Sequence, residues 1–76
     1  MQDVVRCLAR ALVARPERVR VEEFDEDGVI VVELEVADDD RGRVIGRRGK
    51  TAQAIRALAG AIARKQGLEF DLEILE

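Results

Sequence analysis

Apolar residues recur along the chain with two different periods, and these periods predict both helices and strands. In residues 2–14, four apolar residues lie three or four positions apart, the spacing of one helix face: Val5, Leu8, Ala9 and Leu12. Pro16 follows, and the residue before a proline is pushed out of the helical conformation. The pattern therefore predicts a first helix over residues 2–14.

Alternation of apolar and polar residues predicts strands over residues 19–25 and 29–37. In the second strand, one face carries four aliphatic residues: Ile30, Val32, Leu34 and Val36. The other face carries Glu33 and Glu35, so we expect a sheet that is covered on one side only. The segment between the two strands contains Asp27-Gly28, which is a strong signal for a hairpin.

Two further helices and a last strand are predicted in the second half of the chain. Any residue of Asp38-Asp39-Asp40 is suited to cap a helix that begins near Arg41, and Gly46 interrupts this helix after about one turn. A long helix follows over about 50–66, with an apolar stripe along one face: Ala52, Ile55, Leu58, Ala59 and Ile62. Gly67 is suited to end this helix, and residues 69–75 alternate as a strand.

The order of these elements is α-β-β-α-α-β. A strand, two helices and a second strand form a crossover, so strands 29–37 and 69–75 are expected to run parallel. The hairpin adds strand 19–25 antiparallel to its neighbour. The predicted class is α+β, with two layers: a three-stranded mixed sheet and three helices on one face.

The composition limits the size of the core. The chain has 76 residues, of which 47% are hydrophobic, so we expect one domain over residues 1–76. Phe24 and Phe70 are the only aromatic residues, and the core must therefore consist of Val, Leu, Ile and Ala. A core of this size leaves no room for a deep enzymatic pocket.

Cysteine and histidine usage narrows the chemistry further. Cys7 is the only cysteine, which precludes an internal disulfide, and its helical surroundings predict a small buried hydrophobe. Histidine is absent, so the commonest general base and metal ligand is missing, and we expect no metal and no cofactor. We see no signal peptide and no apolar run near the roughly 20 residues of a membrane span. We therefore expect a cytoplasmic protein without a membrane partner.

Charge is distributed unevenly along the chain. The net charge is −3, which by itself argues against a nucleic-acid partner. Residues 41–65, however, hold eight of the 13 basic residues and no acidic residue, while the rest of the chain holds all 16 acidic residues. This split predicts one basic face on an acidic body.

The most informative segment lies inside this basic stretch. It reads Val44-Ile45-Gly46-Arg47-Arg48-Gly49-Lys50-Thr51 and joins the short helix to the long one. Glycine permits positive φ and close approach of another backbone, and a helix N-terminus with free N–H groups attracts anions. Because Arg47, Arg48 and Lys50 add mobile charge there, the segment suits a phosphodiester backbone.

The sequence argues against two kinds of enzyme, a nucleotide hydrolase and an enzyme with an acid–base pair or a metal cluster. Gly49-Lys50-Thr51 matches the end of a P-loop, but the first glycine of that pattern would have to stand at Val44, and a short helix replaces the expected strand. The carboxylates are not gathered by their spacing into an acid–base pair or a metal cluster. The sequence therefore predicts a protein that is not an enzyme.

The segment from Val44 to Lys50 resembles the VIGxxGK core of KH domains, and the element order is similar to the type II arrangement of that family. The similarity is closer still to the small bacterial one-domain KH proteins called KhpA. Three features carry it: Arg15-Pro16-Glu17-Arg18-Val19, the acidic stretch before Arg41, and the Leu72-Glu73-Ile74 ending. One departure is Ala52, where many KH domains have a larger aliphatic residue.

The resemblance implies a non-catalytic protein that holds short single-stranded RNA, about four nucleotides per domain. It implies that the GxxG clamp is Gly46, Arg47, Arg48 and Gly49. Ile45 would line an apolar groove for bases, Lys50 would neutralise phosphate, and Arg43 is a further expected contact. The family resemblance also implies that Ile55 belongs to the core.

Two roles remain open at this point. The first is that of an RNA chaperone or post-transcriptional regulator with slight sequence preference. The second is a protein–protein interaction module, a homodimer or a heterodimer with a KhpB-like KH protein, in which RNA binding is secondary. Sheet edges or helices could form such an interface.

Overall fold

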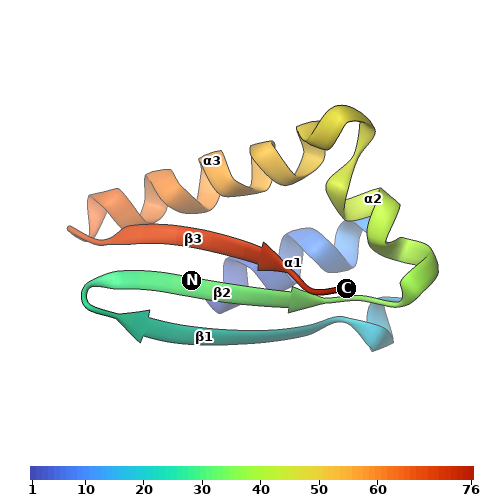
Figure 1. Cartoon of the computed structure of the whole chain (residues 1–76), viewed down its shortest axis with the longest axis horizontal. Helices are drawn as coiled ribbons and strands as arrows, with labels where there is room; N and C mark the ends of the chain where they lie inside the picture. The colour runs from blue at the N-terminus through green and yellow to red at the C-terminus, as the bar shows by residue number, and fades with distance from the viewer.

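The computed structural model describes residues 1–76 and has the predicted order of helices and strands (Figure 1). Short 3₁₀ turns, labelled η, lie between them. The elements are α1 (Gln2–Leu12), η1 (Pro16–Arg18), β1 (Arg20–Glu26), β2 (Val29–Glu35), η2 (Asp38–Asp40), α2 (Arg41–Ile45), η3 (Arg47–Gly49), α3 (Lys50–Lys65) and β3 (Glu69–Ile74).

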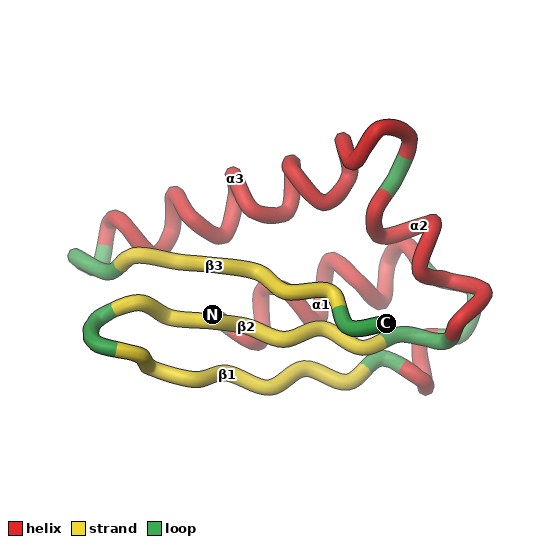
Figure 2. The backbone as a smooth tube through the Cα atoms, viewed as in Figure 1, coloured by secondary structure: helices red, strands yellow, loops and turns green.

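The three strands form one mixed sheet in the order β1-β2-β3 (Figure 2). β1 and β2 are antiparallel, and their hairpin turns at Asp27 and Gly28, which have φ of 53° and 85°. Positive φ at both central residues is what a two-residue turn between right-twisted strands requires. β2 and β3 are parallel, with Val32 opposite Leu72. The predicted crossover and the α+β class are therefore confirmed.

The helices cover one face of the sheet, and the core lies between the two layers (Figure 1). The three helices, β2 and β3 contribute buried residues to this core, and β1 packs the partly buried Val21 against it. The most enclosed members of the core are Val5, Ala9, Val32, Leu34, Val44, Ala59 and Leu72. Ile55 is also buried, as the family resemblance implied, and so is Ala52.

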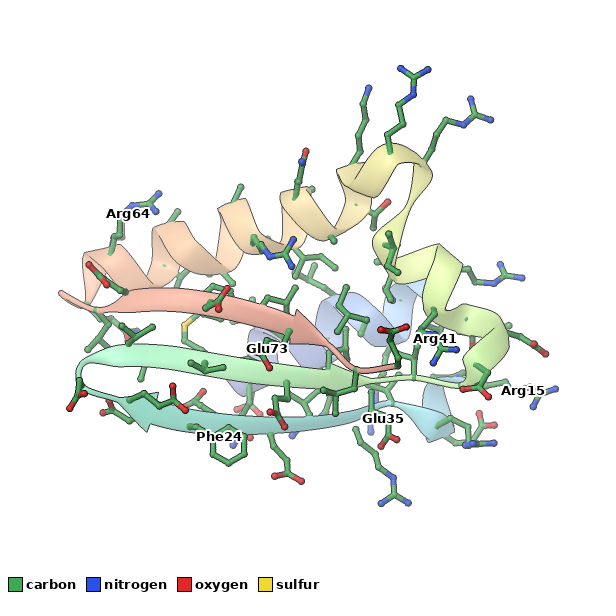
Figure 3. The ribbon with its side chains drawn as sticks, in the orientation of Figure 1. Arg15, Phe24, Glu35, Arg41, Arg64 and Glu73 are labelled. Carbon is green, nitrogen blue, oxygen red and sulfur yellow. The ribbon has the colours of Figure 1, made fainter.

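The opposite face of the sheet is open and acidic. The strand register places seven carboxylates on it: Glu22, Glu26, Glu33, Glu35, Glu69, Asp71 and Glu73. Arg20 is the only basic residue on this face, and Phe24 and Val31 form its apolar centre. Figure 3 shows Phe24, Glu35 and Glu73 on this side. The alternation of Glu33 and Glu35 with apolar residues thus predicted this open face correctly.

β1 is an edge strand, and four of its seven residues are acidic: Glu22, Glu23, Asp25 and Glu26. Glu23 points to the helical side, where its carboxylate accepts a hydrogen bond from the N–H of Gln2 at 2.9 Å. It also pairs with the amino group of Met1 at 3.2 Å. These contacts hold the start of α1 against β1.

Several predictions of burial were wrong. Cys7 is exposed, because it lies on the side of α1 away from Val5 and Ala9. Leu58, expected in the apolar stripe of the long helix, is 49% exposed, and Leu12 is 39% exposed.

None of the helices has the length and the apolar run that a membrane span requires.

Candidate nucleic-acid interface

The turn between α2 and α3 has a backbone that only glycine adopts without strain at its two ends. Gly46 has φ 77° and Gly49 has φ 75°, and one 3₁₀ turn, η3, joins them. A Cβ at Gly46 would overlap both the side chain and the backbone nitrogen of Thr51. Gly46 is therefore fixed by space as well as by φ, whereas a Cβ at Gly49 would meet nothing and φ alone selects glycine there.

Arg48 is a non-glycine residue in the left-handed region, with φ 58° and ψ 26°. This conformation is uncommon for a residue with a Cβ and is found most often where function constrains the backbone. The side chains of Arg47, Arg48 and Lys50 are exposed. None of these three forms an ion pair, in contrast to Arg41 and Arg43 close by.

The start of α3 adds a second attraction for anions. Gly49 is the N-cap residue, and no side chain accepts a hydrogen bond from the first turn of the helix. Free N–H groups at a helix N-terminus carry partial positive charge and bind phosphate oxygens. The turn therefore combines uncompensated cations with uncapped backbone donors at one place.

The other basic residues of segment 41–65 are divided between separate positions. Arg41 pairs with Asp38 at 3.3 Å, and the Nε of Arg43 lies 3.2 Å from Asp40, although 60% of the Arg43 side chain remains exposed. Arg64 lies at the other end of α3 from the turn (Figure 3). Only three of the eight basic residues of this segment lie at the turn, so the single basic face that the sequence predicted is not formed.

Asp40 connects α2 to the segment that follows α1. Its carboxylate is 2% exposed and accepts hydrogen bonds from the N–H groups of Ala14, at 3.0 Å, and Arg15, at 3.1 Å. The hydrogen bond from Ala14 is the main cause that lowers the pKa of Asp40. Desolvation by burial raises this pKa, but the hydrogen bond from Arg15 and the charges of Arg43 and Arg15 lower it further. Asp40 is the N-cap residue of α2, but its side chain makes no capping hydrogen bond. The sequence identified this aspartate but not its distant partners.

The two residues before the turn, Val44 and Ile45, differ in burial. Val44 is completely buried and fixes α2 on the core. Ile45, the next residue, is 39% exposed beside the turn. The exposed side chain is free for contact with a ligand, and the base contact that the family resemblance implies for Ile45 stays a prediction. No group of three or more Cys, Asp or Glu side chains is placed to hold a metal ion.

An apolar hollow of about 250 Å³ lies on the outside of the helical layer, between α1 and α3. Its lining is Leu8, Ala11, Leu12, Thr51, Ala54, Ile55 and Leu58. Leu12 and Leu58 line this hollow and do not belong to the main core, in keeping with their exposure.

The element order, the parallel β-α-α-β unit and the glycine-bounded turn between its helices define a KH domain with an added N-terminal helix and strand. A sequence model of the family described as KhpA/KhpB, KH domain, matches residues 2–74. The chain therefore belongs to the KhpA/KhpB family of KH domains.

Curated relatives named RNA-binding protein KhpA are similar over their full length. The protein from Caldanaerobacter subterraneus subsp. tengcongensis is 43% identical over 75 residues, which are 99% of this chain and 100% of the relative. The one from Halalkalibacterium halodurans is 42% identical over 76 residues, covering 100% of both chains. The one from Aquifex aeolicus is 41% identical over 76 residues, covering 100% of this chain and 96% of the relative.

The fold is also similar to part of a larger solved protein. In a crystal structure of Aquifex aeolicus Era bound to GDP and AlF₄⁻, the match has a TM-score of 0.66 at 24% identity. It covers 96% of this chain and 28% of that protein. At this identity the likeness shows the fold alone.

Proposed function

We propose that residues 1–76 act as a single KH domain that binds single-stranded RNA and catalyses no reaction on it. The observation that carries this proposal is the turn itself, where the unpaired Arg47, Arg48 and Lys50 surround an uncapped helix N-terminus. A run of phosphates can use several such donors in succession. The names of the curated relatives support the same ligand.

The proposed roles follow the geometry of the turn. Gly46 and Gly49 let the RNA backbone approach closely, while Arg47 and Arg48 bracket a phosphate between them. Lys50 neutralises a neighbouring phosphate, and Ile45 contacts a base from the side of α2. Arg43 contributes through the exposed part of its side chain while its Nε remains held by Asp40.

The binding is expected to be of modest affinity, because a few phosphate contacts are lost readily as salt rises. The strong stacking platforms of other RNA-binding folds are also missing, since Phe24 lies on the acidic face of the sheet. These properties suit a cytoplasmic RNA chaperone or post-transcriptional regulator that acts on many RNAs.

The test is a double charge reversal in the clamp, Arg47→Asp with Arg48→Asp. We expect native circular dichroism and a loss of affinity of at least about tenfold for a fluorescent single-stranded RNA. The matched control is Arg10→Asp with Arg18→Asp, which reverses two exposed, unpaired arginines outside the clamp. Equal binding by the clamp variant and the parent would show that the clamp is assigned wrongly.

We also propose that the hollow between α1 and α3 is a protein interface. Its lining is almost entirely apolar, and Leu58 and Leu12 are 49% and 39% exposed. A partner that fills the hollow would remove these two leucine side chains from water, which favours association. The proposed occupant is a second copy of the chain or a KhpB-like KH protein, and this interface does not include the clamp arginines.

A further inference from the structure

Arg56 reaches from α3 to the free edge of the sheet. Its Nη2 donates a hydrogen bond to the carbonyl oxygen of Leu72 in β3 at 3.1 Å. The N–H of Leu72 donates to the Oδ1 of Asp71 at 2.9 Å instead of to β2. Because N–H and C=O of one residue point to the same side in a parallel ladder, both groups of Leu72 face the outer edge of β3. The guanidinium of Arg56 therefore lies at an open strand edge.

The position of Arg56 on α3 brings it near the clamp. Arg56 lies seven positions after Gly49, which is about 10 Å along a helix. Side chains on a helix lean toward its N-terminus, and the N-terminus of α3 is the clamp. A KH clamp holds about four nucleotides, so a base attached to the held backbone is within reach of Arg56.

The guanidinium of Arg56 has donors to spare. The side chain is exposed and forms no ion pair, whereas Arg41 and Arg43 each face a carboxylate. The bond to Leu72 uses one of five N–H groups and holds the planar group in one orientation.

We propose that Arg56 is a specificity-determining residue that selects guanine among the bases next to the clamp. A fixed planar fork with free donors matches two acceptors placed side by side, and guanine presents O6 and N7 in that arrangement. A purely structural link between α3 and β3 would need only one hydrogen-bond donor and no exposed guanidinium. This assignment depends on the proposed RNA binding.

The first test uses the parent protein alone. Fluorescent uridine hexanucleotides carry one guanosine at each position in turn, and a matched set carries 7-deazaguanosine, which lacks the N7 acceptor. We expect one position at which guanosine binds about tenfold tighter than its deaza analogue. Equal affinities at every position would overturn the role of Arg56 while leaving RNA binding intact. Absence of binding to any hexanucleotide would overturn the proposed function as well.

The second test assigns the preference to Arg56. Arg56→Lys keeps the charge and one donor for Leu72 but removes the fork, and Arg10→Lys is the matched control on an exposed, unpaired arginine of α1. We expect the advantage of guanosine to disappear in Arg56→Lys only, with native circular dichroism and unaltered affinity for plain uridine hexanucleotide. A uniform loss of affinity across all hexanucleotides, or an undiminished guanosine preference, would overturn the proposal.

Discussion

Asp40 acts over a long sequence separation. Its two backbone donors, Ala14 and Arg15, are 26 and 25 residues away, so the carboxylate joins the exit of α1 to the start of α2. Because α2 leads directly into the turn between α2 and α3, the hydrogen bonds of Asp40 hold the base of the turn that we propose to bind RNA. The same carboxylate pairs with Arg43 and leaves the rest of that side chain exposed.

Replacing Asp40 should alter stability in a pH-dependent way. The pKa of Asp40 is lowered in the folded protein, so its stabilising contribution is complete above the usual aspartate pKa of about 4 and is lost as pH falls through the lower folded value. We expect Asp40→Asn to unfold at a lower temperature than the parent at pH 7, and the difference to shrink at pH 3. Thermal unfolding followed by circular dichroism measures both.

Asp39→Asn is the matched control, because Asp39 is the neighbouring exposed aspartate with no hydrogen bond or ion pair. It should unfold like the parent at both pH values. A difference between Asp40→Asn and the parent that stays constant with pH would contradict the lowered pKa.

Single residues differ in how well their roles could be predicted. Ile45, Arg47, Arg48 and Lys50 were recognisable from local sequence, since the clamp is a contiguous motif, and they lie together as expected. Cys7 was predicted wrongly, because apolar neighbours in the sequence do not specify which side of α1 a residue occupies. The hydrogen bonds of Asp40 depend on tertiary contacts that no local pattern contains.

At the scale of elements, α1 and α3 share an apolar contact that the core does not use. The periodicity of α3 predicted one stripe, but the helix has two apolar sides: Ala52, Ile55 and Ala59 face the sheet, and Leu58 faces α1 across the hollow. A sequence shows that apolar residues recur at helical spacing but not how many neighbours the helix has.

The proposed protein interface between α1 and α3 can be tested by a substitution at Leu58. Leu58→Glu would bury a charged group without a partner, and we expect it to weaken self-association by at least about tenfold. Sedimentation or light scattering over a range of concentrations measures this effect. Ala57→Glu, an exposed substitution on the same helix, should associate like the parent.

Self-association that persists unchanged in Leu58→Glu would contradict an interface at this hollow. RNA binding by the two variants should be similar, because both add one negative charge to α3 away from the clamp. A selective loss of RNA binding in Leu58→Glu would indicate that the two surfaces are not separate.

Element boundaries moved by one or two residues from the predicted positions for identifiable reasons. The first helix ends at Leu12, because Val13 is already extended with φ −94° and ψ 158°. The second strand ends at Glu35, since Ala37 is already the N-cap residue of η2. The turns η2 and η3 were not predicted, because a single 3₁₀ turn has no hydrophobic period of its own.

At the scale of the whole molecule, charge is separated between two surfaces. The open face of the sheet holds seven carboxylates, while the clamp lies at the junction of α2 and α3. We therefore expect a single-stranded RNA to be repelled from the sheet and attracted to the clamp. The overall charge of −3 conceals this arrangement, which the distribution of charge along the sequence indicated.

The affinity for RNA should follow a shallow salt dependence. With three phosphate contacts from Arg47, Arg48 and Lys50, the slope of log affinity against log salt is expected to be about −2. Arg48→Ala should reduce the magnitude of this slope by about 0.7. Fluorescence anisotropy titrations across a salt series measure it, and an unchanged slope in Arg48→Ala would show that Arg48 does not contact phosphate.

The acidic edge strand β1 also opposes aggregation of the chain. An unpaired strand edge is a template for pairing with other copies and for fibre growth, and like charges placed opposite each other oppose such pairing. The four acidic side chains of β1 supply that repulsion. The strand edge that is most open to pairing with another copy is therefore also the one whose charge resists it.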